Sequence, residues 1–271
     1  NLPESSVTHP AEPGPALFVQ PHYDDAALSC GGSIARQAAA GAAPAMVTVF
    51  AGGLVDEMVG PFAAWKHARW NLTDPDEVQA VRRAEDAAAA AVLGATVRWL
   101  GLPDAIYRGE RYSSDAELFG PLRAEELELA EHLAEELQQL PEWRPGSRVF
   151  VPLGIGSHVD HQLVFECGRH LAAAGVAVYA YEDCPYAIHT PAGLAARLSA
   201  VDAALDAPVT VALDEAALSA RLRAIECYAS QVPVIFRFTD DPGAAVRTYA
   251  EGVGKGRGPA ERFWPLAGAA A

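Results

Sequence analysis

The feature that most constrains this chain is a regular alternation of short apolar runs with longer segments of helical character. Several of the apolar runs carry no polar residue over four positions, as in Ala-Leu-Phe-Val at 16–19. Strands of this kind are buried on both faces, and their alternation with helices is typical of a parallel sheet. The predicted strands span residues 16–20, 46–51, 96–100, 148–152, 176–181 and 209–213. The predicted helices span residues 29–40, 76–93, 115–140, 160–174, 194–205 and 215–228.

This pattern predicts an α/β fold with a three-layer, doubly wound and Rossmann-like arrangement, in which helices cover both faces of a mostly parallel sheet. We expect residues 1–271 to form one domain, preceded within residues 1–15 by an irregular arm that contains four prolines. Doubly wound sheets bind ligands beyond the carboxyl ends of the strands, where the strand order reverses. If the order is 3-2-1-4-5, the first and fourth strands are neighbours, and the loops that follow them should hold the site.

Composition excludes several classes of function. The chain has 20 Lys and Arg against 35 Asp and Glu, which gives a net charge of −15. Nucleic-acid binding through the phosphate backbone is therefore not expected. Hydrophobic residues make up 51% of the chain, so it is not globally disordered. The acidic run at 125–136 predicts a solvated helix face.

Two further features bear on the compartment. The longest uncharged stretch, residues 37–55, contains three glycines and a proline. It reads as a helix end followed by a buried strand, so we predict no membrane span. The four cysteines have irregular spacing, which suits reduced thiols and a cytoplasmic location.

The loops after the first and fourth predicted strands are rich in histidine and aspartate. The first contains His22, Asp24 and Asp25, and the second contains His158, Asp160 and His161. Taken singly, each aspartate could be a helix cap and each histidine an ordinary hydrogen-bonded loop residue. Their coincidence at strand ends that should be adjacent favours a functional site.

Two imidazoles and one carboxylate are a ligand set of catalytic zinc sites. His22 and Asp25, three residues apart, could reach one ion, and His161 could approach it from the other loop. Asp24 and His158 would then remain unligated, as a base for water and a donor to an oxyanion. Asp160, two residues from His158, could fix its tautomer and hold its positive form.

These two motifs resemble the signatures of the PIG-L/LmbE-like zinc deacetylase family. Further segments resemble the family's other blocks: Arg82-Arg83-Ala84-Glu85, Leu102-Pro103-Asp104, the Ser-Gln at 230–231 and the Ala-Glu-Arg-Phe at 260–263. Members of this family remove acetyl groups from N-acetylglucosamine units in glycolipid anchors, thiol precursors and some glycopeptide antibiotics.

The resemblance implies a role for each residue of the two loops. His22, Asp25 and His161 would bind Zn²⁺, Asp24 would be the general base, and His158 would stabilise the oxyanion. Asp160 would orient the catalytic histidine.

It also implies that Arg82 and Asp104 bind sugar hydroxyls, with Arg83 as an adjacent competitor. The chain departs from the family pattern at three positions. Tyr23 replaces a proline, Ala26 replaces a glutamate, and Gly156 stands where some relatives place a tyrosine that assists the oxyanion.

The sequence therefore predicts a metal-dependent hydrolase that removes an N-acetyl or other N-acyl group from an amino sugar or sugar conjugate. Its partner would be that small-molecule substrate, with no nucleic acid and no membrane span, and its oligomeric state stays open. The alternatives are an amidase that cleaves a larger acyl group or a thiol conjugate, and a catalytically silent sugar-binding protein. A nucleotide-binding protein is disfavoured because no glycine fingerprint is present. The same ligands accept Zn²⁺, Fe²⁺ or Co²⁺.

Overall fold

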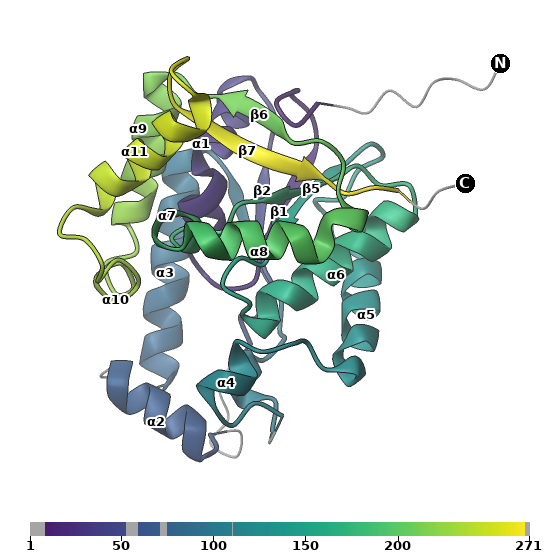
Figure 1. Cartoon of the computed structure of the whole chain (residues 1–271), viewed down its shortest axis with the longest axis vertical. Coiled ribbons are helices and arrows are strands. Elements are labelled where there is room, and N and C mark those ends of the chain that lie inside the picture. Colours follow the sequence, from purple (N-terminus) through teal and green to yellow (C-terminus); the bar gives the residue numbers. More distant parts are fainter. Residues whose placement is uncertain (1–8, 53–58, 71–74, 110, 269–271) are drawn as a thin grey trace.

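A seven-stranded sheet forms the centre of the computed structural model, which describes residues 9–52, 59–70, 75–109 and 111–268 (Figure 1). Its strands lie in the order β3-β2-β1-β4-β5-β7-β6. They are β1 (Ala16–Gln20), β2 (Ala45–Thr48), β3 (Thr96–Trp99), β4 (Arg148–Pro152), β5 (Val178–Tyr181), β6 (Val209–Ala212) and β7 (Ala260–Pro265). The first five strands run parallel, so the predicted order 3-2-1-4-5 is confirmed.

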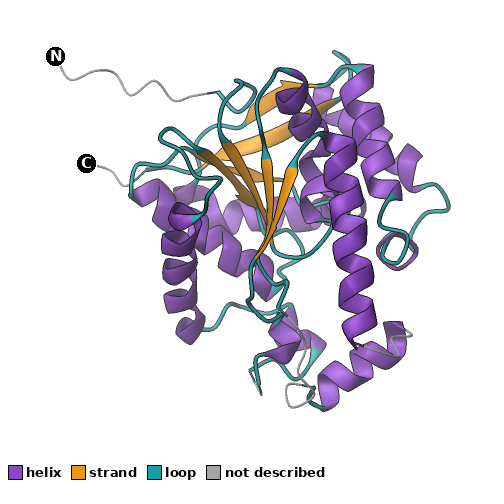
Figure 2. Ribbon diagram, turned by 180° about the vertical axis from the view of Figure 1, so that it is seen from behind, coloured by secondary structure: helices purple, strands orange, loops and turns teal. Residues whose placement is uncertain are grey.

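Helices cover both faces of this sheet (Figure 2). α1 (Asp25–Ala39), α3 (Pro75–Leu93) and α9 (Glu215–Glu226) pack together on one face, while α5 (Leu127–Gln139) and α6 (Val159–Ala173) pack on the other. The remaining helices are α2 (Pro61–Trp70), α4 (Asp115–Leu118), α7 (Tyr186–His189), α8 (Pro191–Val201), α10 (Val232–Ile235) and α11 (Pro242–Gly254). The predicted fold class is therefore confirmed. No helix in these described ranges combines the length and the apolar composition that a bilayer crossing requires.

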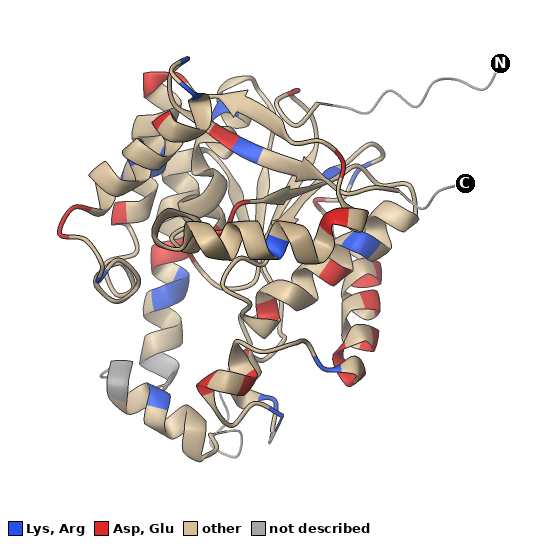
Figure 3. Ribbon diagram, in the orientation of Figure 1, with Lys and Arg blue, Asp and Glu red and all other residues tan. Residues whose placement is uncertain are grey.

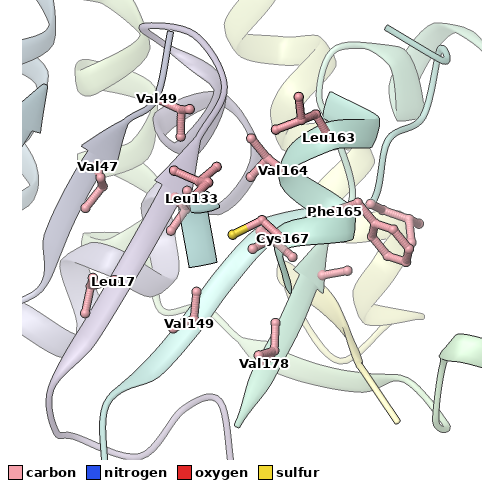
Figure 4. Close-up of a cluster of buried hydrophobic side chains, with 14 of the residues drawn as sticks. Leu17, Val47, Val49, Leu133, Val149, Leu163, Val164, Phe165, Cys167 and Val178 are labelled. Atoms are coloured by element: carbon pink, nitrogen blue, oxygen red, sulfur yellow. The ribbon is translucent and has the colours of Figure 1, made fainter. Parts of the chain in front are cut away.

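Alternation along the strands divides the core between the two faces. Leu17 and Val19 of β1 belong to the cluster beneath α5 and α6, whereas Phe18 belongs to the cluster beneath α1. Figure 4 shows the first cluster, with Leu17 and Val149 of neighbouring strands facing side chains of the two covering helices. Successive side chains of a strand point to opposite faces, so a fully apolar strand supplies both layers.

Several segments differ from the prediction. The helix predicted at 115–140 is interrupted, because α4 ends at Leu118 and α5 begins at Leu127, and the short helices α7 and α10 were not predicted. β7 was not expected, and it pairs antiparallel with both β5 and β6. Its sequence hides a strand because Glu261 and Arg262 break the apolar pattern. Both charges are satisfied by ion pairs, to Arg221 and Glu182 respectively. α2 and α11 also lie in segments without a predicted helix, and α11 ends within the glycine-rich run at 252–258.

The acidic run at 125–136 is a solvated face only in part. Glu128, Glu131 and Glu135 are exposed along α5. Figure 3 shows acidic positions repeated along this helix. Glu126 is instead fully buried, where it accepts hydrogen bonds from Arg108 and Tyr112. Part of the predicted arm at 1–15, residues 1–8, lies outside the described residues.

A buried ion pair ties β7 to α9, and the same carboxylate of β7 also binds backbone amides of α1. Arg221 of α9 lies 3.2 Å from Glu261, and both side chains are almost fully buried. Glu261 also accepts hydrogen bonds from the amides of Gly32 and Ser33, at 2.9 and 2.8 Å. A Cβ at Gly32 would lie 2.6 Å from Leu213, so close packing explains this glycine.

Replacing Glu261 by alanine is expected to lower the free energy of unfolding by about 3–5 kcal/mol, because the buried guanidinium of Arg221 loses its carboxylate partner. Urea denaturation followed by circular dichroism measures this loss. Glu215→Ala, which breaks the exposed pair between Arg247 and Glu215, is the control and should change stability little. Equal effects of the two substitutions would contradict a structural role for the buried pair.

Candidate metal centre and catalytic pocket

A cavity of about 530 Å³ opens at the carboxyl ends of β1 and β4. The loops after these two strands form its floor, and residues of α2, α3 and α10 contribute to its walls. All eight residues singled out in the sequence gather in this region. Seven of them line the cavity, and Asp160 lies directly behind it, fully buried. The expected convergence of the two loops is therefore present in the fold.

Three potential metal ligands meet at the cavity floor. Oδ2 of Asp25 lies 3.6 Å from Nδ1 of His22 and 3.6 Å from Nε2 of His161. Ligand atoms of the three residues all lie within 4.8 Å of one another. Ligand atoms of a tetrahedral zinc site with bonds of about 2.0–2.1 Å would be roughly 3.4 Å apart. The donor set and its spacing therefore fit a divalent metal ion, and these residues could hold one.

Asp183 orients His161, and sequence reasoning missed it. Its Oδ1 lies 2.6 Å from Nδ1 of His161, which leaves Nε2 free toward Asp25. Its Oδ2 accepts hydrogen bonds from the amides of Gly154 and Ile155 at 2.8 and 3.0 Å. A carboxylate behind a ligating histidine is the usual support of such ligands. The available signal was its position two residues after the end of β5, the neighbour of β4 in the sheet.

His22 is oriented in the same way from its other side. Its Nε2 lies 3.0 Å from Oδ2 of Asp160 and 3.3 Å from Oδ2 of Asp104. Burial lowers the pKa of His22, but these two carboxylates outweigh it and raise the pKa well above its usual value. Nδ1 is thereby left facing Asp25. Asp160 thus supports a candidate metal ligand.

Asp160 remains an anion because Arg108 faces it. Burial alone would raise the pKa of Asp160, yet the Arg108 guanidinium, 2.7 Å from Oδ1, holds that pKa well below its usual range. Arg108 is itself fixed by the buried carboxylate of Glu126. A chain of charges therefore runs from Glu126 through Arg108 and Asp160 to His22.

His158 is held differently from the expectation. Its Nδ1 accepts a hydrogen bond from the backbone amide of Asp160 at 3.2 Å, whereas the Asp160 carboxylate lies 3.9 Å from that nitrogen. An acceptor at Nδ1 places the proton of the neutral ring on Nε2. Burial lowers the pKa of His158 to about 3, so the ring is neutral near pH 7. The Asp160 carboxylate was expected to fix the tautomer of His158 and to stabilise its positive form. It contacts Arg108 and His22 instead.

Asp24 lies between the ligand cluster and Arg82. Its φ of 105° is in the left-handed region, which is uncommon for a residue other than glycine. Burial, followed by the neighbouring Asp25, raises the pKa of Asp24 to about 8, while Arg82 at 3.9 Å opposes the shift. A carboxylate whose pKa is near neutrality is suited to accept and return a proton.

The two candidate sugar-binding residues both face the cavity. Arg82 lies over the ring of Tyr23, 5.1 Å from its centroid, so Tyr23 packs beneath a cavity residue. Its competitor Arg83 is occupied elsewhere, by the carbonyl of Ala51 at 2.9 Å and by the ring of Trp99. Asp104 both lines the cavity and contacts His22 through its carboxyl group.

Tyr186 occupies the space that a larger residue at position 156 would need. Gly156 has a φ of 86°, and a Cβ there would lie 2.7 Å from the Tyr186 ring. Tyr186 lines the cavity, and its ring stands perpendicular to that of His161 at 6.2 Å. The glycine is therefore required both by its backbone conformation and by this contact.

Comparison with known proteins identifies the family. Residues 17–172 match the family model described as PIG-L, GlcNAc-PI de-N-acetylase. Two curated relatives are both named 2'-N-acetylparomamine deacetylase. The protein from Niallia circulans is 31% identical over 185 residues, which cover 63% of this chain and 66% of the relative. The protein from Streptomyces fradiae is 32% identical over 190 residues, which cover 68% of this chain and 62% of the relative.

These alignments therefore span slightly less than two thirds of each curated relative. Among solved structures, the A40926 pseudoaglycone deacetylase is 27% identical and superimposes with a TM-score of 0.77, covering 96% of this chain and 100% of that chain. The named relatives are deacetylases of 2'-N-acetylparomamine and of the A40926 pseudoaglycone, and the family match covers more than half of the chain. The chain, with this His-Asp-His cluster at the floor of its cavity, therefore belongs to the PIG-L de-N-acetylase family.

Proposed function

We propose that the protein is a metal-dependent hydrolase that removes an N-acetyl group from an amino sugar or a sugar conjugate. The observation that carries this proposal is the placement of Asp24 and His158 beside the cluster of His22, Asp25 and His161, within one cavity. The relatives' names, which specify deacetylation of 2'-N-acetylparomamine and of the A40926 pseudoaglycone, support it. A divalent cation, with zinc as the first candidate, would polarise the acyl carbonyl and lower the pKa of water.

The remaining steps fall to side chains of the cavity. Asp24 takes the proton of the attacking water and returns it to the leaving amine, for which its raised pKa is suited. His158 donates from Nε2 to the developing oxyanion, which a neutral imidazole can do. Arg82, beside Asp24, and Asp104, beside His22, hold hydroxyl groups of the sugar.

The mouth of the cavity indicates that the substrate also carries apolar surface. Val81, Phe119 and Val234 are about 40% exposed and line the cavity from three different segments. The Phe119 ring lies edge-on to His158 with a centroid distance of 5.3 Å. We therefore propose sugar conjugates with an apolar aglycone as the preferred substrates. A longer acyl chain, packed on the same residues, is the second candidate.

Metal binding is expected to depend on the cluster at the cavity floor. The purified protein should contain about one divalent ion per chain, and His22→Ala and His161→Ala should lose it because two remaining donors bind weakly. Elemental analysis after gel filtration measures this content. His132→Ala, at an exposed position of α5, is the matched control and should retain the metal. Full retention in both cluster variants would refute the ligand assignment.

Asp24→Asn is expected to keep the metal and to lower kcat by about 100-fold or more, as is usual when a general base is removed. Release of free amine from an N-acetylglucosamine conjugate, followed with a fluorogenic amine reagent, gives the rate. Circular dichroism verifies that the variant is folded. Turnover within a few-fold of the unsubstituted protein would rule out Asp24 as the base.

Substrate preference tests the apolar mouth. The phenyl glycoside of N-acetylglucosamine should be deacetylated with about ten-fold higher kcat/KM than the methyl glycoside. Burial of an apolar group of this size is worth more than about 1.4 kcal/mol, which corresponds to ten-fold. Val234→Ser should reduce this ratio without changing kcat for the methyl glycoside. A preference for N-octanoyl over N-acetyl substrates, with no effect of the aglycone, would favour the longer acyl chain.

A further inference from the structure

A fully buried carboxylate ties the carboxyl ends of three strands together beside the catalytic loop. Asp86 of α3 is 0% exposed. It accepts hydrogen bonds from the last residue of each of β1, β2 and β3, namely Gln20 at 3.0 Å, Thr48 at 3.0 Å and Trp99 at 2.8 Å. Tyr228 donates a fourth, at 2.8 Å. Burial of a carboxylate is costly unless it is hydrogen-bonded, and four donors meet that requirement here.

Gln20 connects this carboxylate to the catalytic loop. Its Nε2 donates to Asp86 and to Oγ1 of Thr48, which fixes the orientation of the amide. Its Oε1 therefore points the other way and accepts a hydrogen bond from the amide of Ala26 at 3.0 Å. Gln20 and Ala26 flank residues 21–25, the segment that carries His22, Asp24 and Asp25. One side chain thus spans the segment from end to end.

This link replaces the ordinary cap of α1. Asp24 is the N-cap residue, a position where an aspartate usually accepts a hydrogen bond from an amide of the first turn. Among the described residues its carboxylate caps no amide, and the amide of Ala26 is satisfied by Gln20 instead. The Asp24 carboxylate is therefore left to face the cavity, and its backbone keeps the uncommon φ of 105°. Such a conformation persists only where its surroundings hold it.

We propose that Asp86 is a positioning residue for the catalytic loop: it fixes the Gln20 amide, and Gln20 caps α1 in place of Asp24. The loop then presents Asp24 to the substrate and His22 and Asp25 to the metal. The inference rests on the proposed function for its kinetic test, but its metal-binding test is independent of activity.

Gln20→Met is the first test, because it preserves volume and removes all three side-chain hydrogen bonds of Gln20, those to Asp86, Thr48 and Ala26. We expect kcat to fall at least ten-fold with KM changed less than two-fold, since the loop loses its geometry while Arg82 and Asp104 remain. We also expect the Kd for Zn²⁺, measured by competition with a chromophoric chelator, to rise about 10- to 100-fold. Ile34→Val is the matched control: it also removes buried contacts from α1, far from the loop, and should leave kcat and the Zn²⁺ Kd unchanged.

Reversing the polarity of the link is the second test. Asp86→Asn alone should impair kcat and Zn²⁺ binding. The NH₂ group of the new asparagine would face groups that donate hydrogen bonds to Asp86, so it could no longer hold the Gln20 amide in its orientation. In the double variant Asp86→Asn/Gln20→Glu, the asparagine donates to the new carboxylate, which still accepts from Ala26, and both properties should recover to within about three-fold.

The outcomes separate this inference from the proposed function. If Gln20→Met behaves like Ile34→Val in kcat and Zn²⁺ Kd, or if the folded double variant does not recover, the positioning role is overturned. If the unsubstituted protein releases no amine but Zn²⁺ binding follows the expected pattern, the proposed function fails and the positioning role stands.

Discussion

Because β1 to β5 run parallel, their carboxyl ends lie at one edge of the sheet, and the polar residues of the site enter from that edge. The strand order reverses between β1 and β4, so the loops after these two strands diverge to opposite faces and leave a cavity between them. His22 and Asp25 arrive from one loop and His161 from the other. Asp183 follows β5, the next strand along, and reaches His161 from behind. The site thus depends on the lateral arrangement of strands that are far apart in the sequence.

The buried carboxylates at this edge form two layers that contact different groups. The inner layer orients the imidazoles: Asp183 holds His161, and Asp160, itself neutralised by Arg108, holds His22. The outer layer, formed by Asp24 and Asp25, lies on the cavity. A concentration of buried carboxylates of this kind is costly without positive charge nearby. A divalent ion among them would balance the outer layer, which is consistent with the proposed metal-dependent chemistry.

The apolar architecture was readable from the sequence to a large extent. The six predicted strands are present, and the motifs after β1 and β4 meet where the doubly wound topology requires. β7 was not readable, because its charged residues are compatible with a buried strand only when Arg221 and Glu182 are in place. The same reason hid Glu126 within an acidic run, since only the fold shows that Arg108 and Tyr112 lie against it.

The sequence by itself determined the kind of sheet, the two loops that bear the site, and the set of residue types that could bind a metal. These follow from local periodicity and from the chemistry of individual side chains, both of which are properties of short segments. Only the tertiary structure decided the partners: that the carboxylate of Asp160 serves His22 while its amide serves His158, that Asp183 stands behind His161, and that Gln20 caps α1. Hydrogen-bond partners are chosen by competition among groups from distant segments, and that competition is settled only when the chain has folded.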